Sequence, residues 1–166
     1  MNELDLIHEE LGKAGEISSV SPLVVKLDKY RIMSHTEVPP EEFLLRLFGK
    51  PCFPRRDLSA ITGTEKCGKT FFTSMLMACA VAEEKVAELE RIPEQPLKIL
   101  WYDTEQSLAS TKTILTDRVY QLIALTEDRN PSELDEHFLV FNVRPCTYQE
   151  RMDYLVAAIG TYKPDL

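Results

Sequence analysis

The stretch ITGTEKCGKTFF, residues 61–72, fits the spacing GxxxxGK[ST], with two glycines five positions apart followed by a lysine and a threonine. An apolar run, DLSAIT (57–62), precedes the motif, and a longer apolar run begins at Thr70. The glycines permit a tight turn in which several backbone N–H groups converge at a helix N-terminus, where partial positive charge favours anions. The stretch is therefore predicted to be a phosphate-binding loop between a strand and a helix.

The residue types in the loop suggest individual roles. Lys69 is expected to reach the β- and γ-phosphates of a nucleotide, and the Thr70 hydroxyl is expected to ligate Mg²⁺. The predicted nucleotide-binding residues are Gly63, Thr64, Glu65, Lys66, Cys67, Gly68, Lys69, Thr70 and Phe71. A thiol at a helix N-terminus can be reactive, but a small residue that fills a tight loop is the simpler interpretation of Cys67.

Strand-like and helix-like segments alternate through the rest of the chain. The expected strands are 57–62, 98–103 and 137–143, and the expected helices are 70–89, 108–125 and 148–162. This alternation predicts an α/β layered fold with a parallel sheet and right-handed crossovers. Two other segments are expected to be a short helix at VPPEEFLLRLFGKP (38–51) and an acidic loop or turn at EDRNPSELDE (127–136).

A second polar group follows the strand KILWYD (98–103). Strand alternation puts Asp103 and Glu105 on one face near the carboxyl end of that strand, where ligands bind in open α/β sheets. Asp103, after four apolar residues, loosely fits an aspartate that holds Mg²⁺. Alternatively, Glu105 polarises the water that attacks the γ-phosphate, and the magnesium aspartate lies on a later strand. Asp103 also fits a helix cap near Ser107.

Composition narrows the function classes. The 166 residues suit one domain with an appended segment, and the net charge of −8 argues against a surface that coats nucleic acid, although a local basic loop remains compatible with it. The four cysteines form no CxxC pair, and the acidic N-terminus has no apolar signal core. Free thiols in a cytoplasmic protein are expected. No apolar run approaches the length of a membrane span.

Four quoted segments together resemble one family. They are RRDLSAITGTEKCGKTFFTSMLMACA (55–80), LKILWYDTEQSLASTKTILTDRV (97–119), FLVFNV (138–143) and YKPDL (162–166). They look like the RecA-like P-loop ATPases, closest to the RepA-like, DnaB-like and KaiC-like branch of replicative helicases and mobile-element proteins. The resemblance covers about residues 38–166 and implies a three-layer P-loop NTPase fold with a mainly parallel sheet.

The resemblance also implies roles for residues. Glu105 matches the family's catalytic glutamate, Lys69 its phosphate-binding lysine, and Arg118 a recurrent arginine one helix later. Two departures stand out. Arg56 takes the place of a usual glycine, and the chain stops at KPDL, where the family continues into a Walker B strand with a Mg²⁺-ordering aspartate. The sequence is therefore expected to be a fragment, truncated before that strand; otherwise Asp103 serves the metal alone.

The leading functional hypothesis is an AAA-type, RecA-like ATPase core that binds ATP or ADP with Mg²⁺ and acts on DNA in replication or mobilisation of an element. In that family ATP sits between subunits of a ring. The alternatives are a nucleotide-binding regulatory module without turnover and a small-molecule P-loop kinase. The domain is expected to span 37–166, after an accessory arm at 1–36 that begins with an amphipathic stretch containing Leu4, Ile7 and Leu11.

Overall fold

The computed structural model describes residues 22–166. Glu41–Leu166 form one compact unit, and the described residues 22–40 belong to another. The latter contain helix α2 (Pro22–Asp28), in which no side chain is buried. The amphipathic stretch expected around Leu4 lies outside the described residues. Within residues 22–166, no helix is both long and apolar enough to cross a membrane.

Residues 43–54 form a β-hairpin, so the prediction of a short helix in 38–51 is wrong. Strand β1 (Phe43–Leu47) pairs antiparallel with β2 (Lys50–Pro54) on one edge. On its other edge, β1 pairs antiparallel with β3 (Leu89–Arg91). The two residues of the hairpin turn both have positive φ, as a type I′ turn requires. The apolar run of β1 suits a strand as well as a helix, and pairing on both edges decides between them.

The helix after the phosphate-binding motif is confirmed, although it is shorter than expected. Helix α3 (Lys69–Val81) ends eight residues before the expected terminus at Leu89. The chain then turns at Ala87, where φ is 53°, and a bridge between Val86 and Leu89 leads into β3. The buried residues of α3 are Ser74, Leu76, Met77, Ala78, Cys79, Ala80 and Val81. This nearly continuous burial explains why the helix is apolar almost all round.

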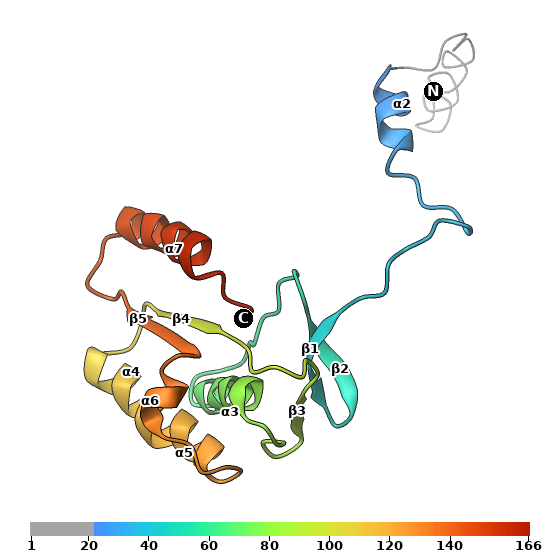
Figure 1. Ribbon diagram of the computed structural model, residues 1–166. Helices are drawn as coiled ribbons and strands as arrows, with labels where there is room; N and C mark the ends of the chain where they lie inside the picture. Colours follow the sequence, from blue (N-terminus) through green and yellow to red (C-terminus); the bar gives the residue numbers. More distant parts are fainter. Residues whose placement is uncertain (1–21) are drawn as a thin grey trace, which may run out of the picture. The chain divides into compact units, whose positions relative to one another are not determined.

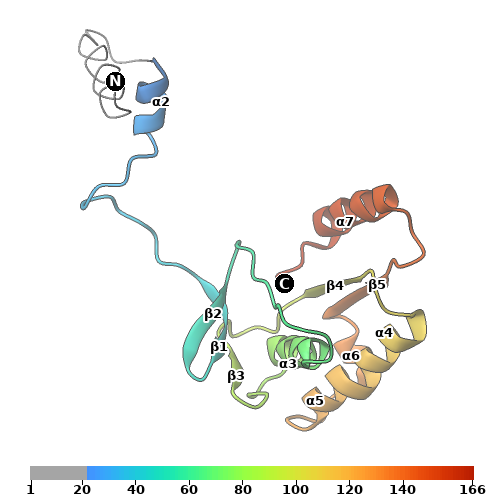
Figure 2. The same ribbon diagram turned by 180° about the vertical axis from the view of Figure 1, so that it is seen from behind.

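The other expected strands and helices form close to their predicted bounds. Strands β4 (Ile99–Asp103) and β5 (Phe138–Asn142) pair in parallel, from Ile99 opposite Phe138 to Asp103 opposite Asn142. The helical segments are α4 (Leu108–Ile114), a π-helical stretch (Leu115–Val119), α5 (Tyr120–Ala124), the single turn α6 (Pro131–Leu134) and α7 (Tyr148–Tyr162). Helix α7 lies on one side of β4 and β5, and α3 and α4 lie on the other (Figure 1), as the reverse view also shows (Figure 2).

The segment 57–62, predicted to be a strand before the loop, is irregular, and that prediction is wrong. A strand needs a hydrogen-bonding neighbour, and within residues 22–166 no strand pairs with this segment. Leu58 is consequently 91% exposed. The structure therefore has a three-stranded antiparallel sheet, β2-β1-β3, and one parallel pair, β4-β5, in place of three parallel strands.

The last residues of the chain lie along the free edge of β4. The N–H of Asp165 donates to the carbonyl of Lys98 at 2.8 Å, and the N–H of Leu100 donates to the carbonyl of Leu166 at 2.8 Å. Because the N–H of Ile99 donates toward the β5 side, to His137, that of Leu100 points to the opposite edge. The segment after α7 thus begins a parallel pairing with β4.

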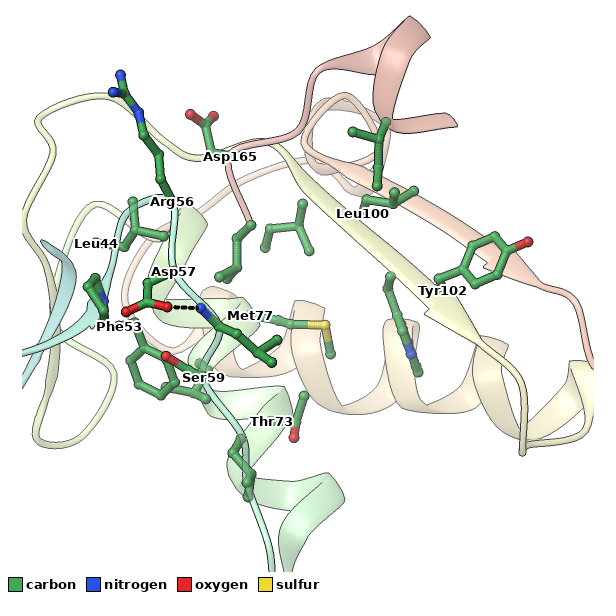
Figure 3. Close-up of a pocket in the computed structure, with 18 residues that line it drawn as sticks. Leu44, Phe53, Arg56, Asp57, Ser59, Thr73, Met77, Leu100, Tyr102 and Asp165 are labelled. Carbon is green, nitrogen blue, oxygen red and sulfur yellow. Dashed lines mark hydrogen bonds between the residues drawn. The ribbon is translucent and has the colours of Figure 1, made fainter. Parts of the chain in front are cut away.

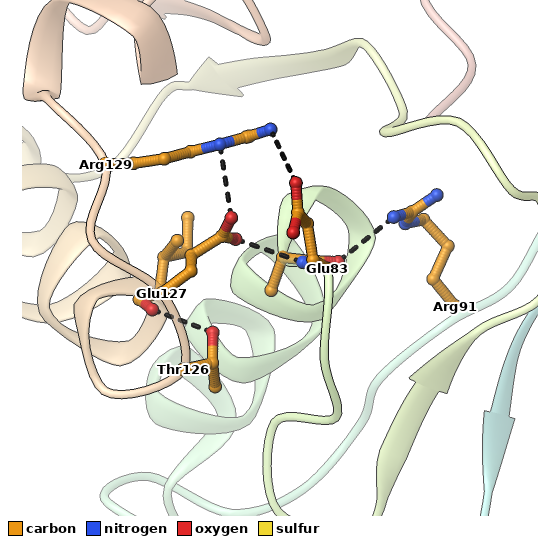
Figure 4. Close-up of polar contacts among 7 residues, drawn as sticks. Glu83, Arg91, Thr126, Glu127 and Arg129 are labelled. Carbon is orange, nitrogen blue, oxygen red and sulfur yellow. Dashed lines mark hydrogen bonds and ion pairs between the residues drawn. The ribbon is translucent and has the colours of Figure 1, made fainter.

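A polar cluster fixes the C-terminal end of α3 (Figure 4). The Arg91 guanidinium donates to the carbonyl of Ala82 at 3.1 Å, and Glu127 accepts the N–H of Glu83 at 3.0 Å. Arg129 pairs with Glu127 at 3.2 Å. A cation that binds the last carbonyls of a helix satisfies groups with no partner inside the helix and suits its dipole. The cluster therefore holds α3, and with it the loop at its other end.

The hairpin turn provides a test of this fold. Phe48 has a φ of 49° and is 72% exposed, so its side chain adds little burial while its backbone is in a conformation that favours asparagine or glycine. Phe48→Asn should raise the free energy of unfolding by about 1 kcal/mol, measured by urea denaturation. Leu58→Asn, a matched change at an exposed position without positive φ, should give no such gain. An unchanged or lower midpoint for Phe48→Asn would contradict the turn assignment.

Candidate nucleotide-binding site

The two glycines of the motif lie at the tightest points of the loop. Gly68 is the N-cap of α3 and has a φ of 90°, a backbone conformation that strains residues with a side chain. At Gly63, a Cβ atom would lie 2.6 Å from the Cys67 sulfur, which is too close for real contacts. The loop therefore packs tightly on itself before the chain enters α3. The Cys67 sulfur lies against Gly63, while the residue itself is exposed.

Lys69 folds back over the loop that precedes it. Its ammonium group donates to the carbonyls of Gly63 and Thr64, at 2.8 Å each, and lies 3.9 Å from the Cys67 sulfur. The neighbouring Thr70 is exposed, and its hydroxyl has no hydrogen bond to any described residue. The two side chains expected to contact phosphate and Mg²⁺ thus differ: one is held by its own loop and the other is free.

A cavity of about 300 Å³ brings the start of α3 and the end of β4 together. Its polar lining comes from Lys69, Thr70, Thr73, Asp103, Thr104, Glu105 and Gln106, and its apolar lining includes Ile61, Trp101 and Ile114. Residues 63–68 and Phe71 do not line this cavity. Phe71 is half-exposed, and the Arg118 guanidinium lies 5.9 Å from the centre of its ring. The cavity therefore brings Lys69 and Thr70 of the phosphate-binding motif close to the two carboxylates that follow β4.

Asp103 is buried and bonded on both carboxylate oxygens. Its Oδ1 accepts the N–H groups of Glu105 and Gln106 at 3.0 Å each, and its Oδ2 accepts the Thr111 hydroxyl at 2.7 Å. Burial raises the pKa of Asp103, but the N–H of Gln106, the Thr111 hydroxyl and the N–H of Glu105 together lower it below its ordinary value. The ionised carboxylate therefore holds the turn after β4.

Glu105 contrasts with Asp103, although both line the cavity. Its side chain is exposed, and its carboxylate makes no hydrogen bond or ion pair with any residue in 22–166. A carboxylate without a protein partner at the wall of a cavity can accept a proton from water or contact a cation. The two carboxylates thus differ chemically: one is bound by the protein and the other is available.

Two residues near this site were not found from the sequence. Thr111, on α4, and Asn142, the last residue of β5, are hydrogen-bonded to each other at 2.7 Å. The Asn142 amide also donates to the carbonyl of Gln106 at 3.0 Å. A polar residue at the carboxyl end of the apolar run FLVFN was the signal that could have indicated Asn142, because parallel strands end at a common edge.

The loop and its helix, joined to a cavity at the end of a parallel strand, define a nucleotide-binding domain of the P-loop ATPase type. Residues 35–159 match the family model described as AAA domain, which is more than half of the chain. The chain belongs to that family. No curated protein and no solved structure matches it. The RepA-like, DnaB-like and KaiC-like branch remains a proposal.

The residues at the cavity fit Mg²⁺ delivered with a nucleotide better than a metal held by the protein alone. Among residues 22–166 there is no group of three His, Cys, Asp or Glu side chains that could hold a metal ion. Mg²⁺ commonly binds through one or two protein ligands together with substrate phosphates and water. The free Thr70 hydroxyl at the cavity wall suits this arrangement.

The role of Lys69 can be measured directly. The attraction between an ammonium group and a phosphate oxygen about 4 Å away is of order 4 kcal/mol at an effective dielectric constant of 20, before desolvation. Lys69→Ala should therefore weaken ATP binding by roughly tenfold or more, as measured by calorimetry. Lys85→Ala, which removes a lysine paired with Glu90 away from this cavity, is the control. Equal ATP affinity of folded Lys69→Ala and the parent chain would refute the site.

Proposed function

We propose that the chain is the ATP-binding core of a RecA-like ATPase that hydrolyses ATP and works as a motor or switch on DNA, in replication or in mobilisation of a genetic element in the cytoplasm. One observation carries the ATPase part. Lys69 and Thr70 share a cavity with Glu105, a carboxylate that has no partner among residues 22–166. The role on DNA rests on the resemblance to replicative helicases and mobile-element proteins.

In this mechanism the loop first exchanges its own contacts for those of the nucleotide. The Lys69 ammonium leaves the carbonyls of Gly63 and Thr64 and binds the β- and γ-phosphates, while loop N–H groups bind phosphate oxygens. The Thr70 hydroxyl would hold Mg²⁺ carried by the nucleotide, and the bound ion would neutralise phosphate charge. Glu105 orients the attacking water and accepts its proton. Asp103 is the alternative metal ligand. To bind the metal, its carboxylate would have to give up hydrogen bonds to the N–H groups of Glu105 and Gln106.

We also propose that the fold is a three-layer one with a mainly parallel sheet, in which a further strand lies beside β4. A cavity of about 680 Å³ between the 57–61 segment, α3 and β4 supports this proposal (Figure 3). Its lining is largely apolar and includes Leu44, Phe53, Met77, Leu100, Trp101 and Ile159. The bonds of Asp165 and Leu166 to the β4 edge lead toward it. A strand here would give the unpaired 57–62 segment a neighbour and could supply a Mg²⁺-ordering aspartate.

We also propose that the active form is a ring of subunits. No arginine is among the residues that line the cavity of the loop and Glu105. Phosphoryl transfer commonly needs a cation that stabilises the charge of the transition state. An arginine from a neighbouring subunit would meet that need. The same lining gives no support to a small-molecule kinase, which needs arginines around its substrate phosphate.

A regulatory module that binds ATP without turnover is the second candidate. It is favoured by the bonds between the Lys69 ammonium and the loop carbonyls, because binding alone could release them and reorganise the loop. Hydrolysis stimulated by DNA in the full-length protein separates the two candidates. Binding of ATP without hydrolysis, with and without DNA, would favour the regulatory module.

The two carboxylates can be compared by substitution in the full-length protein. Glu105→Gln keeps the shape of the side chain and removes the base, so ATP affinity should persist while kcat falls by roughly two orders of magnitude or more. Asp103→Asn is measured beside it, through kcat and nucleotide Kd. If Asp103→Asn abolishes Mg²⁺-dependent binding while Glu105→Gln has no effect, Asp103 is the metal ligand and the assignment of Glu105 fails.

The 166-residue chain by itself should bind ATP but hydrolyse it slowly or not at all. Positioned Mg²⁺, an oriented water and a charge-stabilising cation act together in phosphoryl transfer, and the lining of the cavity offers no arginine. Release of phosphate by the purified monomer, measured beside its ATP affinity, tests this expectation. Rapid turnover by the monomer would mean that Asp103 and the groups already present complete the site.

A further inference from the structure

A continuous hydrogen-bond network joins the ends of β4 and β5 to the start of α4. The Asn142 amide donates to the Thr111 hydroxyl oxygen at 2.7 Å, and the Thr111 hydroxyl donates to Asp103 Oδ2 at 2.7 Å. Asp103 Oδ1 then accepts the N–H groups of Glu105 and Gln106. Thr111 is 3% exposed and Asp103 is 5% exposed, so most of this network is shielded from water.

The network has one consistent direction of hydrogen bonding. The second N–H of the Asn142 amide donates to the carbonyl of Gln106 at 3.0 Å, so both amide protons are used. The Thr111 hydroxyl has a single proton, and the Asp103 carboxylate is the acceptor that ends the chain of donors. The Ser107 carbonyl, 3.1 Å from the Thr111 hydroxyl, is the competing acceptor. Donors aligned in this way strengthen one another in a buried environment.

This network holds the backbone on both sides of the Glu105 side chain. Asp103 fixes the N–H of Glu105 and the N–H of Gln106, and Asn142 fixes the carbonyl of Gln106. The Glu105 carboxylate itself is exposed and makes no hydrogen bond or ion pair with another described residue. The position of the backbone therefore sets the point from which this side chain projects and the range that its carboxylate can reach. Errors of about 1 Å in the position of a catalytic group can reduce its rate by about a hundredfold.

We propose that Thr111 and Asn142 are positioning residues that aim Glu105 at the phosphate cavity, through the hydrogen bonds that they make with Asp103 and with the carbonyl of Gln106. The proposal rests on the proposed role of Glu105 as the base in ATP hydrolysis. The proposal also assigns a role to Asp103. Its carboxylate binds the Thr111 hydroxyl, which Asn142 contacts, and the N–H groups of the turn. Because Thr111 and Asn142 are not among the residues that line the cavity, their loss should spare ATP affinity.

The experiment compares Thr111→Val, which keeps the shape and removes the hydroxyl, with Thr111→Ser, which keeps the hydroxyl. In the full-length protein, Thr111→Val should lower kcat about tenfold or more, leave the ATP Kd within about twofold, and Thr111→Ser should restore most of the rate. Asn142→Leu should behave as Thr111→Val does. Thr116→Val is the matched control, because the Thr116 hydroxyl bonds only to Lys112 and Asp117, outside this network.

A second measurement on the 166-residue chain does not depend on hydrolysis. Amide hydrogen exchange of Glu105 and Gln106, followed by NMR, should accelerate in Thr111→Val and remain slow in Thr111→Ser and Thr116→Val. If Glu105→Gln abolishes hydrolysis while Thr111→Val does not lower it, the positioning role is wrong. If Glu105→Gln itself leaves hydrolysis unchanged, the proposed base fails, and faster exchange in Thr111→Val then shows a purely structural network.

Discussion

The in-register parallel pairing of β4 with β5 is the constraint on which the candidate site depends. It ends both strands at one edge and places Asp103 directly opposite Asn142. With the hydroxyl of Thr111 between them, a buried carboxylate gains enough donors to stay ionised. A shift of the register would take Asn142 away from Thr111 and from the carbonyl of Gln106, while Asp103 would keep the N–H groups of its own turn. The register therefore links the turn that carries Glu105 to β5.

Helix α3 connects this edge to the phosphate-binding loop. Its N-terminus carries the loop, and its buried residues pack among the core side chains that surround them. At its other end, Arg91 binds the carbonyl of Ala82, so the helix is anchored at its C-terminus. The dipole of a helix held in this way points its positive end at the loop. The anchoring of α3 thus contributes to the geometry of a phosphate site at the opposite end of the helix.

The sequence predicts the parts of the fold that local patterns determine. The start of α3, the strands β4 and β5 and the bounds of α7 follow from apolar periodicity and from turn residues. The pairing of β1 with β3 and the irregular 57–62 segment could not be predicted in this way, because each depends on whether a distant strand lies beside it. Thr111 and Asn142 were missed for a related reason: single polar residues on separate elements show no spacing, and only the fold brings them together.

The charges around the cavity suggest why nucleotide and Mg²⁺ should bind together. Asp103 and Glu105 both line the cavity, and the cation among the lining residues is Lys69, whose ammonium group is bound to loop carbonyls. A triphosphate brought into this space alone would share it with two carboxylates, and like charges repel more strongly where water is displaced. Mg²⁺ bound to the phosphates would offset that repulsion and would be a favourable charge partner for Glu105. In the proposed function, we therefore expect nucleotide binding to depend on the metal.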